Sequence, residues 1–197
     1  MAVTDEQIRF DRTLAAWDRI ETWLLRYAPQ SHAALPGPAE PSVVESAEAA
    51  MGPLPPELRA LWGLHNGTDR DGPGRLRILK DYDVFPVADA IWCYENVLTV
   101  LLDANDMGTR PWIPACASET DEPHLWNFID TTTGRLGWNV HAGAFTEPDE
   151  SGDTFVGWME GIAAELEGGG GAAGSKQRPS VIDGWLTWNE GRHHFPG

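Results

Sequence analysis

The chain has 197 residues, a length that suits one domain with a hydrophobic core and appended segments better than two domains. Hydrophobic residues make up 42% of it and ten residues are Trp, which excludes a fully disordered chain because this much apolar surface can offset the entropy of ordering. Asp and Glu number 30 against 14 Lys and Arg, and the net charge of −16 argues against nucleic acid or an anionic membrane as a partner, whereas it would attract a basic protein or a cation.

Apolar residues at intervals of three and four predict a first helix over residues 5–27. They are Phe10, Leu14, Trp17, Ile20 and Leu24. Thr4 and Gln7 match a capping box at the start of this helix. Pro29 should end it one residue earlier, because proline disfavours helical geometry in the residue before it. A Pro-rich loop is expected over residues 31–41.

Two shorter helices should follow this loop. Ser42 and Glu45 form a second capping-box pattern before a short helix that Gly52 should end. Pro55 and Pro56 suit the first turn of a third helix, where a missing N–H costs nothing. The apolar stripe of this third helix consists of Leu58, Leu61, Trp62 and His65. We therefore expect Trp62 to lie in the core.

The rest of the chain predicts both helix and strand. A turn-rich loop and a short strand are expected between residues 68 and 83. Apolar positions over residues 88–102 favour a helix, although their β-branched residues leave a strand possible. Three strands are predicted next, over residues 112–115, 125–129 and 135–140, the last two as a hairpin. An amphipathic helix should follow Asp153 and end at Gly168.

Composition also predicts the domain organisation. The Gly/Ala/Ser stretch over residues 168–175 has the composition of a flexible linker. We therefore expect one domain over residues 1–167, this linker, and a C-terminal tail over residues 176–197. Because the tail contains Trp185 and Trp188, we expect it to dock on the domain.

The sequence contains no recognisable motif for catalysis or for a cofactor. It lacks a G-x-S-x-G turn, and in the glycine-rich segment Ser175 precedes Lys176, the reverse of the order in a phosphate-binding loop. The six His residues never fall at i, i+4 spacing, and the acidic residues 69–83 lack the Asp/Asn alternation and final Glu of a calcium loop. We therefore expect a protein that is not an enzyme and that binds no cofactor or metal.

The two cysteines, Cys93 and Cys116, form no C-x-x-C pair, so we expect both to be reduced and buried. The N-terminal residues lack the basic segment and apolar run of a secretory signal, and no window approaches 18 consecutive apolar residues. These features predict a soluble cytoplasmic protein.

Several segments, taken together and in order, resemble the SUKH superfamily, and in particular its Smi/Knr-type domains. Residues 17–24 (WDRIETWL) resemble the first helix of that family. The most specific likeness is in residues 48–67, which are similar to the family's pattern of Glu, Gly, Leu-Pro, an aromatic residue and Asn-Gly. Four further segments recur in the family's order, at residues 85–90, 112–115, 128–134 and 153–158.

The resemblance implies an α+β fold with a mixed, largely antiparallel sheet packed against several helices, and a role in binding other proteins. Bacterial members commonly neutralise nuclease, deaminase or other secreted toxins, so it indicates an immunity protein whose partner is a cognate protein toxin. The negative charge suits a basic toxin. The first alternative is a regulatory or scaffolding module of the same family. The second is an enzyme or a small-ligand binder.

The candidate partner-binding residues are carboxylates in acidic loops between the predicted elements. A rigid scaffold can present variable side chains there, and their charge can steer a basic toxin. They are Asp69, Asp71, Asp81, Asp83, Glu119, Asp121, Glu122, Glu147, Asp149 and Glu150. The alternative for each residue is a solvated loop without a partner.

Overall fold

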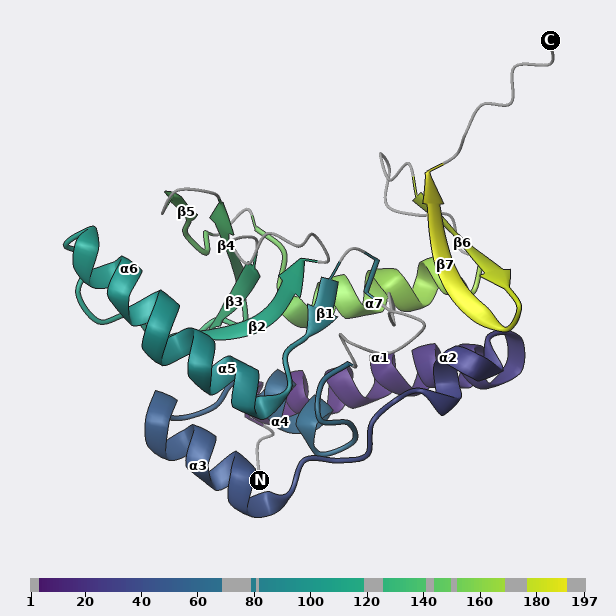
Figure 1. Ribbon diagram of the computed structural model, residues 1–197, viewed down its shortest axis with the longest axis horizontal. Helices are drawn as coiled ribbons and strands as arrows, with labels where there is room; N and C mark the ends of the chain where they lie inside the picture. The colour runs from purple at the N-terminus through teal and green to yellow at the C-terminus, as the bar shows by residue number, and fades with distance from the viewer. Residues whose placement is uncertain are drawn as a thin grey trace, which may run out of the picture.

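The computed structural model describes residues 4–68, 79–80, 82–118, 126–140, 144–149, 152–168 and 177–190. Over these residues the protein has the predicted α+β fold, with a five-stranded sheet, a separate two-stranded sheet and several helices (Figure 1). All strand pairs in the described part of the chain are antiparallel.

The larger sheet is a meander in which each strand pairs with the next one along the chain. Its strands are β1 (Tyr82–Val84), β2 (Trp112–Ser118), β3 (Trp126–Asp130), β4 (Leu136–Val140) and β5 (Ala144–Thr146). The three predicted strands are confirmed, and β2 is longer than expected. A register shift between Pro114 and Cys116 lies within it, which is where a proline without an N–H is tolerated.

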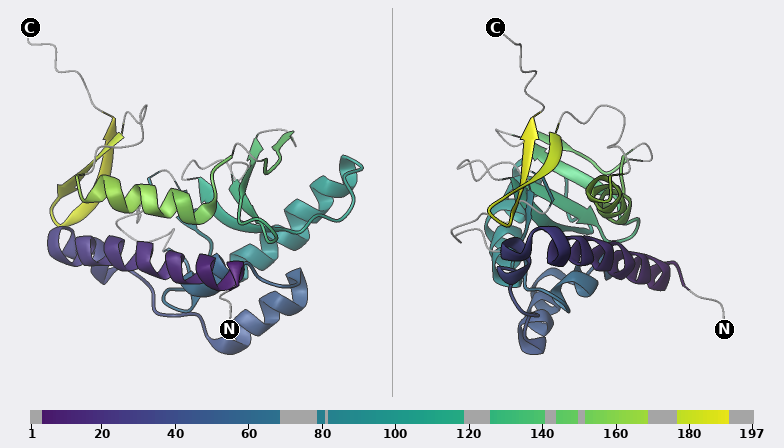
Figure 2. Two further views of the ribbon diagram at one scale, coloured as in Figure 1. Left: turned by 180° about the vertical axis from the view of Figure 1, so that it is seen from behind. Right: turned by 90° about the vertical axis from the view of Figure 1, so that its right-hand side faces the viewer.

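Helices lie on both sides of this sheet. They are α1 (Asp5–Tyr27), α2 (Pro29–Ala33), α3 (Pro41–Met51), α4 (Pro56–Trp62), α5 (Val87–Cys93), α6 (Thr99–Ala104) and α7 (Phe155–Leu166). A π-helical turn, η1 (Tyr94–Leu98), joins α5 to α6 as one long helix. Helices α1 and α7 pack together on one side of the sheet, and the long helix lies on the other (Figures 1 and 2).

The first helix begins and ends where the sequence predicts. Thr4 Oγ1 accepts a hydrogen bond from the Gln7 backbone N–H at 3.2 Å, which caps the helix start. The Gln7 side chain, however, donates to Asp11 at 2.8 Å. The capping box is therefore only half formed.

Two helix starts differ from the prediction because proline suits the first turn of a helix. Helix α3 begins at Pro41 after Glu40, so Ser42 lies inside the helix and does not cap it. Helix α2 begins at Pro29 and takes up the first residues of the expected Pro-rich loop.

The long helix confirms the helical alternative for residues 88–102. Its buried residues include Ala90, Cys93, Leu98 and Leu102, which face the rest of the core. The π-helical turn widens the backbone between α5 and α6, and such turns are rare in proteins. Packing against the sheet has outweighed the strand preference of the β-branched residues here.

Trp62 lies in the core, as its helical spacing predicts. Its side chain is 0% exposed, and its indole Nε1 donates to the Phe85 carbonyl at 2.9 Å. The ring therefore both fills the core and ties the end of α4 to the segment between β1 and α5.

Trp62→Ala should destabilise the protein by about 3–5 kcal/mol, because it leaves a cavity and removes the hydrogen bond to the Phe85 carbonyl. Urea unfolding followed by circular dichroism measures the loss. An unchanged midpoint would mean that the ring does not support the core.

The C-terminal tail forms a hairpin of β6 (Gln177–Ile182) and β7 (Trp185–Glu190). Asp183 and Gly184 make its two-residue turn with φ of 51° and 82°, as a type I′ hairpin requires. The turn packs on α2, where the Gly184 carbonyl accepts from Gln30 N–H at 3.0 Å and Leu186 N–H donates to Ser31 Oγ at 2.8 Å. The tail is thus attached to the domain by these hydrogen bonds and by Leu186 and Trp188, whose side chains are buried in the core.

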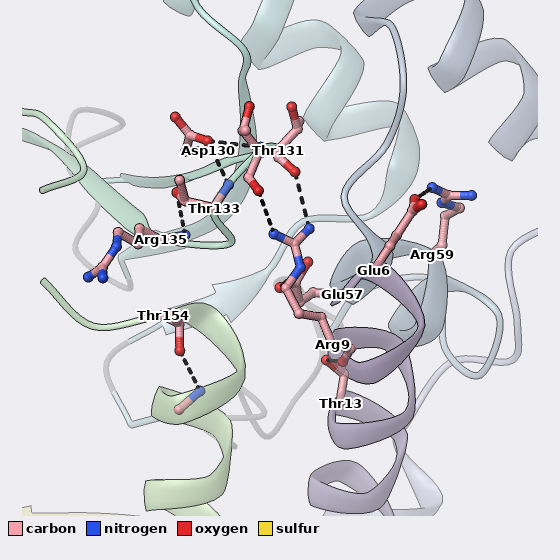
Figure 3. Close-up of polar contacts among 12 residues, drawn as sticks. Glu6, Arg9, Thr13, Glu57, Arg59, Asp130, Thr131, Thr133, Arg135 and Thr154 are labelled. Atoms are coloured by element: carbon pink, nitrogen blue, oxygen red, sulfur yellow. Dashed lines mark hydrogen bonds and ion pairs between the residues drawn. The ribbon is translucent and has the colours of Figure 1, made fainter. Parts of the chain in front are cut away.

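A buried ion pair joins α1, α4 and the turn between β3 and β4 (Figure 3). Arg9 Nε lies 3.3 Å from Glu57 Oε1, and the Arg9 guanidinium donates to the carbonyls of Thr131 and Thr132 at 3.1 and 3.2 Å. Glu57 is fully buried. Burial raises the pKa of Glu57, and the nearby Arg9 charge opposes part of that rise.

Glu57→Gln should change how stability depends on pH. Because the pKa of Glu57 is raised above its ordinary 4.5 in the folded state, the contribution of this residue to stability should be greatest below pH 4.5 and should be lost as pH rises through the folded pKa. The amide does not titrate, so the variant should lack this loss. Urea unfolding of both proteins across this pH range measures the effect, and a difference that is constant with pH would contradict it.

Candidate functional site

Three of the ten candidate loop carboxylates lie in the described part of the chain. Glu147 and Asp149 are exposed in the connection between β5 and α7. Asp83 is 5% exposed and accepts a hydrogen bond from Thr68 Oγ1 at 3.0 Å. An exposed loop position is therefore wrong for Asp83, because pairing of β1 with β2 turns its side chain inward. The others, Asp69, Asp71, Asp81, Glu119, Asp121, Glu122 and Glu150, lie outside the described residues.

Several of the 14 Lys and Arg side chains are neutralised within the protein. Five of them pair with carboxylates on other elements: Arg9 with Glu57, Arg12 with Glu160, Arg19 with Glu167, Arg59 with Glu6, and Lys80 with Glu165. The hydrogen bonds from Arg12 and Arg19 lower the pKa of Glu160 and Glu167, so both carboxylates stay ionised. The charges of these five cations are therefore balanced locally, by carboxylates of the protein itself.

The basic residues of the protein are distributed unevenly between its helices. The sequence has no Lys or Arg in residues 28–58 or in residues 81–109, which contain α3 and the long helix. Helix α3 packs beside α5 (Figure 1). We call the exposed side chains of these helices the acidic helical face, which comprises Glu45, Glu48, Trp92, Glu95, Val100 and Asp103.

Trp92 is the exposed tryptophan of the protein. All ten Trp residues are described, and only Trp92, at 60%, is exposed, while the others are buried or half-buried. Val100 is 57% exposed on the same helix, and Asn96 between them donates its side-chain N–H to the Trp92 carbonyl at 2.9 Å. The acidic helical face therefore combines carboxylates with an aromatic ring.

The sequence carries two signals for the acidic helical face. The apolar positions that predicted the long helix leave Trp92 on the opposite, polar side, where a large aromatic ring is unusual. The absence of Lys and Arg is also readable from the sequence. Both observations gain meaning only when the helix and its exposed side are established.

Trp92→Phe should remove most of the tryptophan fluorescence that aqueous ions can quench. Caesium should quench the wild type more than iodide does, because the surrounding carboxylates attract cations. Trp62, being buried, should contribute little to this fraction. If the variant retained the wild-type quenchable fraction, Trp92 would not be the accessible ring.

A second surface feature is a groove of about 700 Å³ between α1, the end of α7 and β6. Its lining includes Arg19, Trp23, Tyr27, Glu167 and Val181. The Trp23 and Tyr27 rings lie 5.2 Å apart. Because the lining mixes both signs of charge with apolar surface, it indicates no single class of ligand.

His65 takes part in a contact that joins three segments. The Glu21 carboxylate lies 3.4 Å from His32 Nε2 and 3.6 Å from His65 Nε2, and His65 Nδ1 lies 2.6 Å from the Pro36 carbonyl. A carbonyl can only accept, so Nδ1 carries a proton. This arrangement connects α1 to the chain on either side of α3 and α4.

The described residues bear on two kinds of chemical site, a metal site and a reactive cysteine. Within them, no group of three or more His, Cys, Asp or Glu side chains could hold a metal ion. Cys93 and Cys116 are buried and form no disulfide, and burial, with a smaller contribution from Asp83, raises the pKa of the Cys116 thiol well above its ordinary value. A protonated buried thiol is a poor nucleophile. No helix in the described ranges is long and apolar enough to cross a membrane.

Comparison with known proteins does not assign a family. No family model matches the chain, and no curated protein matches it. The resemblance to SUKH domains therefore stays a prediction, and function has to be argued from the surface itself.

Proposed function

We propose that the protein is a non-enzymatic binding domain of the SUKH type, which acts in the cytoplasm as an immunity protein against a cognate secreted toxin. The observation that carries the proposal is the distribution of charge. Five cations are used in pairs within the protein, while the acidic helical face has no basic residue to balance its carboxylates.

This charge suits a basic toxin. Toxins that act on nucleic acids need cationic clefts to hold their substrates, and a carboxylate-rich inhibitor is drawn to such a cleft before contact. Exposed charges act over about 10 Å at 0.1 M salt, so the attraction should weaken as salt rises. A net charge of −16 makes such steering strong at low salt.

Co-expression tests the proposal directly. The chain, expressed in a bacterial host with a toxin encoded beside its gene, should protect the host, co-purify with the toxin and inhibit the toxin's activity. A regulatory or scaffolding module would bind a partner without giving protection. Growth arrest despite equal expression of both proteins would refute the immunity role.

Charge reversal tests the electrostatic part. Glu95→Lys with Asp103→Lys should slow association with the toxin about tenfold at low salt and flatten its salt dependence. The matched control reverses two exposed carboxylates of α1, Asp11 and Asp18, which changes the net charge equally. Equal slowing by both pairs would show that only the total charge matters.

A further inference from the structure

Exposing an aromatic ring on a rigid helix is costly unless something covers it. Trp92 is 60% exposed, although burial of a large ring is among the most favourable contributions available to a protein. The adjacent residues Ile91 and Cys93 face inward, so the ring does not sit on a poorly packed segment. Exposed tryptophans on well-packed elements are typical of interfaces, where this residue type is enriched.

The backbone that carries Trp92 is held in place at both ends. At the start of α5, Val87 N–H donates to the Asn66 side chain at 2.9 Å. After it, Leu98 and Leu102 are buried at 0% and 5% exposure. The backbone at Trp92 is thus fixed before binding, which lowers the entropy lost in a complex.

Carboxylates lie on either side of the ring. Asp89 and Glu95 are three residues before and after Trp92, which places them within one helical turn of it. Asp103 extends the negative charge along α6, next to the exposed Val100. A complementary partner must therefore present an apolar pocket with cations at its rim.

Other occupants fit this surface less well. A second copy of the chain, related by two-fold symmetry, would bring the same carboxylates against one another. An anionic membrane or a nucleic acid would be repelled by them. The chemistry of the surface favours a basic protein.

We propose that Trp92 is the anchor of the acidic helical face and inserts into an apolar pocket, rimmed by Lys and Arg, on a basic partner protein. Tryptophan is among the residues most often found at the energetic centre of interfaces, surrounded by contacts that exclude water. The inference rests on the proposed function, since it names the surface that contacts the toxin.

Two peptide probes separate the role of the ring from that of charge. One is a helical Lys/Leu peptide about 18 residues long with a single apolar face, and the other is a Lys-only peptide of equal charge. Calorimetry with the full chain gives affinities, and the indole N–H signals in NMR spectra show which ring is contacted. The Trp92 signal, assigned by its loss in Trp92→Ala, should shift with the Lys/Leu peptide.

Trp92→Ala should weaken binding of the Lys/Leu peptide about tenfold or more and leave the Lys-only peptide within about twofold. Leu25→Ala, which removes a side chain that is 61% exposed on α1, is the matched control and should change neither affinity. Unchanged affinity of Trp92→Ala for the Lys/Leu peptide, or a Trp92 signal that does not move, would overturn the inference.

The same variant in the co-expression assay separates this inference from the proposed function. Full protection by Trp92→Ala, with an affinity for the toxin within about twofold of wild type, would refute the anchor while the immunity role stands. Loss of protection with roughly 30-fold weaker toxin binding would support both. If the wild type fails to protect but the peptide results are as expected, the immunity role is refuted and the basic-protein surface stands.

Discussion

The arrangement of the helices against the sheet depends on one buried charge interaction. Arg9 on α1 and Glu57 on α4 meet beside the β3–β4 turn, and Arg9 also binds two carbonyls of that turn. Removing charges from water is costly, so such a pair specifies one geometry more than it adds stability, and loss of one partner is worse than loss of both. Gly134 belongs to this constraint, since its φ is 70° and a Cβ there would lie 2.6 Å from Glu57 Oε1.

With α1 fixed in this way, the two sides of the sheet acquire different characters. On one side, α1 and α7 are linked by the Arg12–Glu160 and Arg19–Glu167 pairs, in which each arginine charge is neutralised by a carboxylate. On the other side, α3 and the long helix keep their carboxylates unbalanced and expose Trp92. The two sides thus differ in how their charges are balanced, because Arg–Glu pairs lie between α1 and α7 whereas α3 and the long helix have no Lys or Arg.

Features set by neighbouring residues could be predicted from the sequence, whereas features set by distant contacts could not. The spacing from Phe10 to Leu24 and the effect of Pro29 are local, and α1 has the predicted bounds. Asp183-Gly184 is likewise a local signal, typical of the two-residue turn that joins β6 to β7. The burial of Asp83 depends on strand pairing, and the meeting of Arg9 with Glu57 depends on the whole fold. The amino-acid composition does not distinguish these two buried carboxylates, Asp83 and Glu57, from exposed ones.

The hairpin of β6 and β7 limits the order in which the protein can fold during its synthesis. It closes on residues far earlier in the chain, since Leu186 bonds Ser31 across 155 positions. Synthesis proceeds from the N-terminus, so Ser31 and the surface of α2 beneath the hairpin stay uncovered until β6 and β7 have been synthesised. Contacts so distant in sequence form slowly, because a long loop must close first. The hairpin therefore completes the surface around the first two helices only after the strands of the larger sheet have been synthesised.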